Sequence, residues 1–513
     1  MSVRGMVLLL VLAPSVMSAQ RDSAQRAATS PPTLSVGPAI HRISTASAVS
    51  TEQLGSISSV RQLPDGRVLL NDGARRRLLL LDTTLKLVNV VLDSLSESEN
   101  YYGTRVGGLV PFRADTTLFI DPAAFAMIVI DPNGKMTRVR SVPRVRDAGT
   151  LSSTGNGIPG VDAKGRIIYR MYAEAAPPKV APPPGMPWFP QEPDSAFIVG
   201  IDLDSRKLDT LGAIRIPKSE NSIRISPTGG FNFTQVTNPL PSTDEWATLP
   251  DGVIAFVRGR DYRIDYLDGD GKITSSAKLP YPWQRLTEEN KQAIVDSVRQ
   301  VQTRQAMNGY ISSLIRWVNQ YGNEYPKDLV VPKDFTVSQG LQKSWKLPPG
   351  ASFPARYIYA CAPGEEPTML PSPDAATTPS APVPAGPPGP PGALTGTPSC
   401  IPGPISVPGG NSPPMPQLRT DGVMAPADLP DYRPPFPTNG VRADGDGGLW
   451  VRINTPNPIQ GGTVYDVINR KGELVDRIQL PQGYSLAGFG AGKIVYLTMR
   501  DASGVHLARV RLR

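Results

Sequence analysis

The sequence contains very little histidine and cysteine, with two of each among 513 residues. His41 and His506 both fall inside predicted strands, so we interpret both as ordinary strand residues. Zinc hydrolases and histidine-ligated lyases need several such ligands, and Ser-His-Asp catalysis needs a histidine beside its nucleophile. We find no catalytic signature of these kinds, and we predict no metal site and no cofactor.

Long hydrophobic runs are also missing beyond the N-terminus. Arg4, the apolar run 6–13 and the small residues before Ala19 have the order of a secretory signal peptide. We expect cleavage after Ala19, with Ser18 as the second choice and an uncleaved anchor as the alternative. No later segment reaches the 18 apolar residues that a spanning helix needs. The sequence therefore predicts an exported chain, periplasmic or secreted, without a transmembrane segment after cleavage.

The two cysteines, Cys361 and Cys400, lie in a proline-rich tract. Export would allow them to form a disulfide, and two free thiols are the alternative. Two cysteines without a nearby histidine do not make a metal site.

The net charge of +8 is spread along the chain and not concentrated in one block. Nucleic-acid binding needs a basic stripe or a recognisable module, and the sequence has neither. We predict no nucleic-acid partner, and we expect a monomer.

A repeated phrase of turns and short apolar runs organises what is present. Residues 63–92 read as three strands separated by tight turns, beginning with Pro64, Asp65 and Gly66. The phrase returns five more times. The six units cover residues 55–92, 107–143, about 158–211, 244–279, 439–480 and 484–513.

The last unit supplies three strands before the chain ends, and residues 38–44 form a lone strand near its beginning. Four-stranded units closed by a strand from the other terminus describe a β-propeller, because such closure removes the exposed sheet edge. We therefore predict an all-β fold, a six-bladed β-propeller closed by an N-terminal strand. A sandwich or barrel is the competing interpretation, but neither explains the repeat.

The repeated motif resembles six-bladed propellers of the NHL/TolB-like kind from exported bacterial proteins. The matching positions include the turns at Asp65-Gly66, Asp251-Gly252 and Asp446-Gly447. The resemblance covers most of residues 38–282 and 436–513. It implies the fold and leaves function open, because this fold serves lyases, lactonases, sialidases and binding modules.

Insertions divide the chain between these propeller parts. We expect a signal peptide at 1–19, a disordered segment at 20–35, blades one to four with the closing strand at 36–282, a helical insertion at 283–330, a proline-rich and largely disordered insertion at 331–435, and blades five and six at 436–513. The tract 362–418 has too little apolar surface to offset its ordering entropy.

The helical insertion opens with Thr287 as a helix cap and has apolar residues at three- and four-residue spacing. The helix could pack on the propeller surface, or it could serve as a lid or a docking element.

All long insertions fall on one end of the predicted disc, which we call the decorated face. It consists of the second-to-third-strand turns and the links between blades. The opposite end, the trimmed face, has only short turns. Binding residues tend to lie on loops held by a rigid scaffold, although neutral drift in tolerated loops would give the same pattern.

Arginine and aromatic residues are the candidate binding residues of the decorated face, because both types are common interface anchors. They are Arg75, Arg76, Arg77, Tyr101, Tyr102, Arg258, Arg260, Tyr262, Trp283, Arg285 and Arg452. We predict a binding or scaffold module for a protein or glycan of the cell envelope.

The alternative function is a hydrolase or lactonase with an unrecognised metal site. Residues 266–277 imitate a calcium-binding loop, but Tyr266 and Ala277 occupy its first and last ligand positions. We therefore interpret this segment as a hairpin turn.

Overall fold

The computed structural model describes most of the repeat units and part of the insertions. The described residues are 36–95, 100–171, 193–217, 220–225, 231–333, 335, 346–351, 422–455, 459–501 and 504–512. The signal peptide, both cysteines and the tract 362–418 lie outside them.

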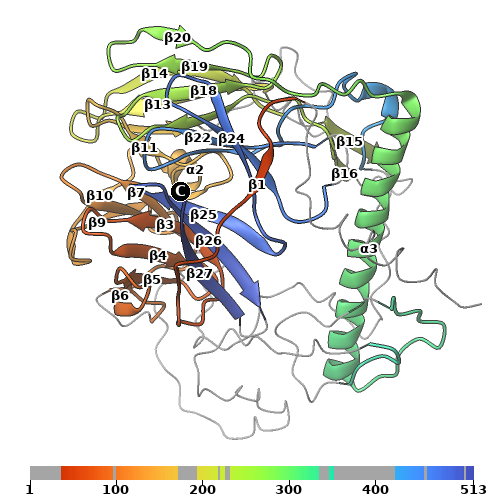
Figure 1. The fold of residues 1–513 in the computed structure, drawn as a ribbon. Coiled ribbons are helices and arrows are strands. Elements are labelled where there is room, and N and C mark those ends of the chain that lie inside the picture. The colour runs from red at the N-terminus through yellow and green to blue at the C-terminus, as the bar shows by residue number, and fades with distance from the viewer. Residues whose placement is uncertain are drawn as a thin grey trace, which may run out of the picture.

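Six four-stranded antiparallel units form the blades of a propeller, as predicted (Figure 1). Blade 1 is β3 (Ile57–Gln62), β4 (Val68–Asp72), β5 (Arg77–Leu81) and β6 (Leu87–Leu92). Blade 2 is β7 (Gly108–Pro111), β8 (Thr117–Asp121), β9 (Ala126–Ile130) and β10 (Met136–Ser141). Blade 3 is β11 (Gly160–Val161), β12 (Ile167–Arg170), β13 (Ser195–Ile201) and β14 (Leu208–Arg215).

The other three blades follow the same order of strands. Blade 4 is β17 (Glu245–Thr248), β18 (Ile254–Arg258), β19 (Arg263–Leu267) and β20 (Ile273–Ser275). Blade 5 is β21 (Val441–Ala443), β22 (Leu449–Arg452), β23 (Val464–Ile468) and β24 (Leu474–Gln479). Blade 6 is β25 (Tyr484–Gly490), β26 (Ile494–Asp501), β27 (Gly504–Arg511) and the N-terminal β2 (Ala48–Val49).

The burial of the strands explains why their apolar runs are nearly continuous. Every residue of β4 and β8 is buried, whereas every residue of the fourth strand β20 is exposed. The middle strands are covered on both faces by neighbouring blades, so they need apolar residues at successive positions. Tight turns separate them, as at Gly66, whose φ of 85° suits glycine.

The N-terminal segment closes the propeller, but with different residues from those predicted. Residues 38–44 were expected to pair with the last strand of blade 6. Instead, β2 pairs with β27, in the register Ala48 to Arg509 and Val49 to Ala508. The earlier strand β1 (Ile40–Arg42) adds to blade 5 as a fifth strand, parallel to β24. The apolar pattern of β1 is satisfied there, because Ile40 is fully buried against Ile453 and Val464.

A buried ion pair lies beneath the start of this segment. Arg477 donates to Asp466 with a distance of 2.6 Å between Nε and Oδ1, and both side chains are fully buried. Arg477 also donates to the backbone carbonyls of Val36 and Pro280. One guanidinium therefore joins blade 5 to the N-terminal segment and to the chain that leaves blade 4.

The trimmed face consists of short turns, as predicted. The shortest turn spans residues 491–493, and the longest spans residues 202–207. Several of its contacts join one blade to the next. Arg113 of blade 2 pairs with Asp204 of blade 3 at 3.2 Å, and Arg470 of blade 5 pairs with Asp251 of blade 4 at 2.8 Å. Some of the arginines therefore hold neighbouring blades together through ion pairs.

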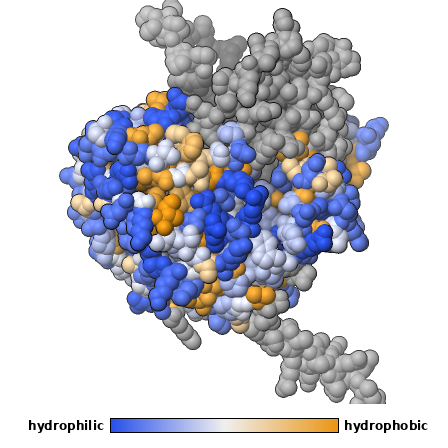
Figure 2. Space-filling model, turned by 90° about the horizontal axis from the view of Figure 1, so that it is seen from above, coloured by the Kyte–Doolittle hydropathy of each residue, from blue (hydrophilic) through white to orange (hydrophobic). Residues whose placement is uncertain are grey.

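The links on the decorated face carry the additional elements. Between blades 2 and 3 lie η1 (Val145–Asp147) and α2 (Ala148–Ser152), and between blades 3 and 4 lies the hairpin of β15 (Glu220–Ile225) and β16 (Phe231–Val236). The sequence did not predict these elements. The surface in Figure 2 shows small hydrophobic patches separated by larger hydrophilic areas.

The insertion between blades 4 and 5 contains α3 (Glu288–Tyr321), which stands beside the disc (Figure 1). The Thr287 side chain accepts from the backbone N–H of Asn290, which confirms the predicted cap. The apolar contacts of the N-terminal half include Val295 with Val423 and Leu429. The short 3-10 helix η3 (Pro426–Asp428) lies between Val423 and Leu429.

The C-terminal half of α3 packs against other parts of the insertion. Ile311 and Ile315 form a cluster with Phe335, and Trp317 packs with Tyr325 and Leu329. The described helix therefore buries its apolar stripe mainly within the insertion. None of the helices in the described ranges is both long and apolar enough to cross a membrane.

Candidate binding pocket on the decorated face

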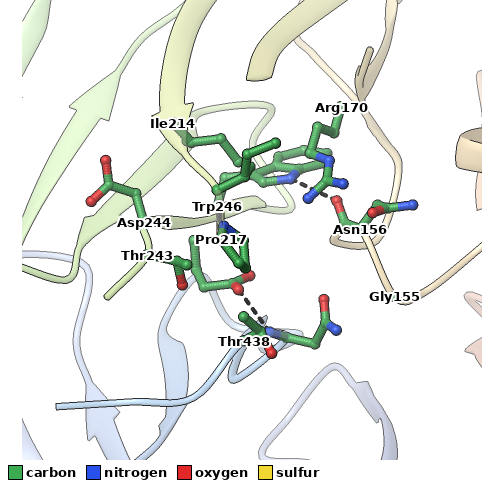
Figure 3. Close-up of a pocket in the computed structure, with 12 residues that line it drawn as sticks. Gly155, Asn156, Arg170, Ile214, Pro217, Thr243, Asp244, Trp246 and Thr438 are labelled. Atoms are coloured by element: carbon green, nitrogen blue, oxygen red, sulfur yellow. Dashed lines mark hydrogen bonds between the residues drawn. The ribbon is translucent and has the colours of Figure 1, made fainter. Parts of the chain in front are cut away.

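A pocket of ≈ 240 Å³ opens where the links of blades 2, 3 and 4 meet the start of blade 5. Its polar and apolar walls are lined by Gly155, Asn156, Arg170, Ile214, Ile216, Pro217, Thr243, Asp244, Glu245, Trp246, Thr438 and Asn439 (Figure 3). Ile214, Ile216 and Pro217 form the apolar wall. Most of the other side chains are polar, so the pocket can combine an apolar contact with several hydrogen bonds.

Trp246 fixes one wall of the pocket. Its indole N–H donates to the backbone carbonyl of Asn156 at 2.9 Å, and the side chain is almost fully buried. Gly157 lies so close to the indole that an added Cβ would be 2.4 Å from Nε1. This close approach requires glycine and holds the link between blades 2 and 3 against β17.

Glu245, the first residue of β17, is only 7% exposed. Its carboxylate accepts from the backbone N–H of Asn439 at 2.7 Å. Burial raises the pKa of Glu245 to about 6, although this hydrogen bond and the charges of Arg442, Arg170 and Arg452 act in the opposite direction. No arginine among the described residues forms an ion pair with Glu245.

The three arginines around Glu245 have few partners of their own. Arg442 donates to the carbonyl of Val441 at 2.8 Å, and Arg452 to the carbonyl of Thr438 at 3.4 Å. Nε of Arg452 is buried without an acceptor. Arg170 has no hydrogen-bonding or ion-pair partner within the described ranges, and Figure 3 shows its guanidinium near Asn156. Burial lowers the pKa of Arg170 and of Arg442.

Asp244, the neighbour of Glu245, is already engaged. Arg258 donates to it at 3.0 Å and to Asp265 at 2.8 Å. The backbone N–H groups of Arg215 and Gly259 also bond to Asp244. The predicted binding residue Arg258 is therefore a structural bridge within blade 4. With Asp244 paired to Arg258, the guanidinium groups of Arg170, Arg442 and Arg452 have one nearby carboxylate, that of Glu245.

Two of the predicted aromatic residues are core residues. Tyr102 and Tyr262 are 0% exposed, so neither can contact a partner. Tyr102 donates to Asn71, and Tyr262 donates to Asp466 at 2.7 Å. Each phenol donates to a polar side chain that is itself buried, Asn71 of blade 1 and Asp466 of blade 5, which is why a tyrosine and not a phenylalanine is needed there.

The arginines of blade 1 also bind parts of the scaffold. Arg75 donates to the carbonyl of Gln53 at 2.6 Å, and Arg76 donates to the carbonyl of Gly103 at 3.0 Å. Arg77 lies 3.6 Å from the buried carboxylate of Asp72. These contacts tie the second-to-third-strand turn of blade 1 to its neighbouring links.

The remaining predicted residues are more accessible but do not line the pocket. Arg260 and Arg285 are exposed, Tyr101 is half-buried, and Trp283 is 41% exposed with its ring edge-on to Tyr281. The candidates therefore do not form one site. Arg452 is the single predicted residue that belongs to the arginine group around Glu245.

Sequence reasoning missed Arg170, Arg442 and Glu245, although the sequence contained a signal for each. Arg170, Arg258 and Arg452 all end the second strand of their blade. Aligning the units would have revealed this shared position. Glu245 and Arg442 lie in the first strands β17 and β21, which contact each other. An ionisable residue among apolar ones in such a strand indicates a polar neighbour.

The described residues contain no group of three or more histidine, cysteine, aspartate or glutamate side chains that could hold a metal ion. The donors that line the pocket are the guanidinium of Arg170 and several amide and hydroxyl groups. Of its two carboxylates, Asp244 is paired with Arg258, and Glu245 lies near Arg170, Arg442 and Arg452. This donor set suits an anion better than a cation.

Comparisons with known proteins show low similarity. No family model matches the chain, and no curated protein matches it. One similar solved structure is a catalytically inactive virginiamycin B lyase from Staphylococcus aureus with quinupristin, at 13% identity over 45% of this chain and 73% of that chain, with a TM-score of 0.23. Another is a gluconolactonase from Xanthomonas campestris, at 14% identity over 49% of this chain and 89% of that chain, with a TM-score of 0.22. A third is a nidogen/laminin complex, at 10% identity over 43% and 80%, with a TM-score of 0.20. These values carry no argument about function, and the six-bladed fold rests on the sheet topology described above.

Proposed function

We propose that this chain is an exported six-bladed propeller of the NHL/TolB-like kind that acts as a binding module, with its ligand site in the pocket of the decorated face. The signal-like N-terminus and the repeated turn motif support export and the subtype. A protein or glycan of the cell envelope is the expected partner.

The observation that carries this proposal is the excess of positive charge around a pocket at the links between blades. Arg170, Arg442 and Arg452 surround the one carboxylate of Glu245, and Arg170 lines the pocket wall. Elsewhere in the propeller, arginines such as Arg477 are paired with buried carboxylates. Cations held in a low-dielectric site without their counterions favour the binding of an anion.

A glycan array and a pull-down from envelope extracts test the proposal with the purified chain. We expect a specific partner whose capture falls when Thr243, a pocket residue, is replaced by a bulky side chain as in Thr243→Trp. Lys471→Glu, on a trimmed-face turn, is the matched control and should leave capture unchanged. Equal loss from both variants, or no partner in either screen, would contradict the proposal.

A hydrolase is the second candidate, favoured by the pKa of about 6 at Glu245. A buried carboxyl group with such a pKa can donate or accept a proton near neutral pH. An esterase and lactonase panel tests this candidate. Turnover that disappears in Glu245→Gln would support it, and an inactive panel with intact partner binding would exclude it for those substrates.

A further inference from the structure

We infer that the pocket binds the carboxylate of a sugar acid of about monosaccharide size, such as the terminal uronate of an envelope glycan. This inference rests on the proposed binding function and specifies its ligand. Three features of the pocket lead to it: the unpaired hydrogen-bond donors, the size, and the composition of the walls.

The pocket contains donors for which the described residues supply no acceptor. Of the lining residues, Arg170 has no hydrogen-bonding or ion-pair partner within those ranges, and Oγ1 of Thr243 is buried without a hydrogen bond. Arg452 donates to the carbonyl of the lining residue Thr438, and its Nε is buried without an acceptor. An unsatisfied buried polar group costs about 1–3 kcal/mol. A ligand that brings acceptors removes this cost on binding, and a carboxylate matches the planar fork of a guanidinium.

The size of the pocket limits what can enter. Pockets for drug-sized ligands have volumes of about 300–1,000 Å³, and this pocket is smaller at ≈ 240 Å³. It can hold one sugar ring or a comparably small acid. A longer segment of a polymer would have to continue outside the pocket, so the recognised group would be a terminal one.

The pocket walls offer both apolar surface for the C–H groups of a sugar ring and hydrogen-bonding groups for its hydroxyls. Ile216 and Pro217 offer an apolar surface for the C–H groups of the ring. Thr243, Thr438 and Asn156 offer hydroxyl and amide groups for the hydroxyls of the ring (Figure 3). A simple anion such as acetate would use the arginine and leave the remaining polar groups without partners.

Isothermal titration calorimetry on the full exported chain with the methyl glycoside of glucuronic acid tests the inference. The methyl glycosides of glucuronamide and glucose are the neutral ligand controls, and acetate is the control for charge alone. We expect glucuronate to bind about 10–100-fold more tightly than its amide, since hydrogen bonds to a charged group contribute about 1.5–3 kcal/mol.

Matched variants locate the bound carboxylate. Arg170→Gln should reduce glucuronate affinity by about 10–100-fold, while Arg170→Lys, which keeps the charge and loses the fork, should give an intermediate reduction. Arg138→Gln removes the same charge from the exposed fourth strand of blade 2 and should have no effect. Thermal unfolding of each variant shows whether it is folded, and the Arg170→Lys result applies where Arg170→Gln fails to fold.

The outcomes separate the ligand class from the proposed function. Equal affinity for glucuronamide and glucuronate would overturn the inference, as would equal losses from Arg138→Gln and Arg170→Gln. If no uronate binds while the partner screen still gives Thr243-dependent capture, then the inference fails and the binding function stands. If both fail, the proposed function falls as well.

Discussion

Glu245 and Tyr262 are both buried ionisable residues, but their surroundings give them different roles. Tyr262 meets a single strong acceptor, Asp466, and burial together with that carboxylate raises the pKa of its phenol, so it remains a donor. Glu245 accepts a backbone hydrogen bond and is surrounded by arginines that do not touch it. The phenol of Tyr262 is therefore paired with its acceptor, whereas the arginines around Glu245 form no ion pair with its carboxylate.

The pKa of Glu245 predicts how ligand affinity depends on pH. Arg170, Arg442 and Arg452 face Glu245, and the adjacent Asp244 is paired elsewhere. An ionised Glu245 repels a bound carboxylate, so anion binding raises its pKa further and favours its protonated form. We expect uronate affinity to rise as pH falls from 8 through about 6, by about tenfold for each unit by which the ligand raises this pKa.

Calorimetric titrations at a series of pH values measure this dependence. Glu245→Gln should flatten it and bind at pH 8 as tightly as the natural chain does near pH 5. Tighter uronate binding at pH 8 than at pH 5.5 in the natural chain would show that Glu245 does not compete with the ligand.

Tyr262 leads to a prediction about stability. Tyr262→Phe removes the donor to Asp466, which keeps its bond to Arg477 but stays buried. We expect a loss of about 1–3 kcal/mol in the free energy of unfolding, measured by urea denaturation. Arg260→Ala, in the adjacent exposed turn, should change it by no more than about 0.5 kcal/mol. Equal stabilities of the two variants would contradict the assigned role of the phenol.

At the scale of elements, the N-terminal segment contributes one strand to each of two blades. β1 extends blade 5, and β2 completes blade 6 as its outer strand before the chain continues into β3 of blade 1. The backbone N–H groups of Ser47 and Ser50 donate to the carbonyls of Arg509 and Leu507 at 2.7 and 2.8 Å. Closure of the disc therefore depends on a few hydrogen bonds in a very short strand.

Ser50→Pro tests this closure. It removes the N–H that donates to Leu507 and also the hydroxyl that accepts from the Leu507 N–H. We expect a destabilisation of about 3 kcal/mol or more that affects the whole disc and lowers the midpoint of one cooperative transition. Thr45→Pro, between β1 and β2 and exposed, is the control and should have little effect. Local fraying with an unchanged midpoint would show that β2 does not close the propeller.

At the scale of the whole molecule, the insertion and the propeller have separate hydrophobic clusters. The described part of the insertion has its own apolar clusters around Ile315 and Val295. The blades have theirs, such as the cluster of Val257, Tyr262 and Val451 between blades 4 and 5. The tract 362–418 lies outside the described residues, between residues 351 and 422.

Replacing residues 362–418 by a Gly/Ser linker of equal length should leave the propeller stable. The proline-rich composition gives the tract no core to share, and the entropy of a long surface loop changes slowly with length. We expect a melting temperature within about 4 °C of the natural value, measured by scanning calorimetry. A second variant that deletes the tract separates composition from length. Loss of soluble expression in both would show that the tract is structural.

The sequence by itself determined the six repeat units, their short turns and the end of the disc that carries the insertions. These features are local, since tight turns and apolar runs of strand length act over a few residues. The capped helix at Thr287 could be predicted for the same reason. The tertiary structure decided which N-terminal strand pairs with which blade, because β1 and β2 find partners more than 400 residues away and both fit an outer edge.

The site also depended on tertiary structure. Exposure cannot be read from residue type, so Tyr262 and Arg258 were predicted as binding residues and are held in the scaffold. Arg170, Glu245 and Arg442 come from three different blades, and no local pattern states that they meet. They come together because the first strands β17 and β21 of blades 4 and 5 lie side by side and the second strand β12 of blade 3 ends at the decorated face, an arrangement that exists only once the blades have assembled.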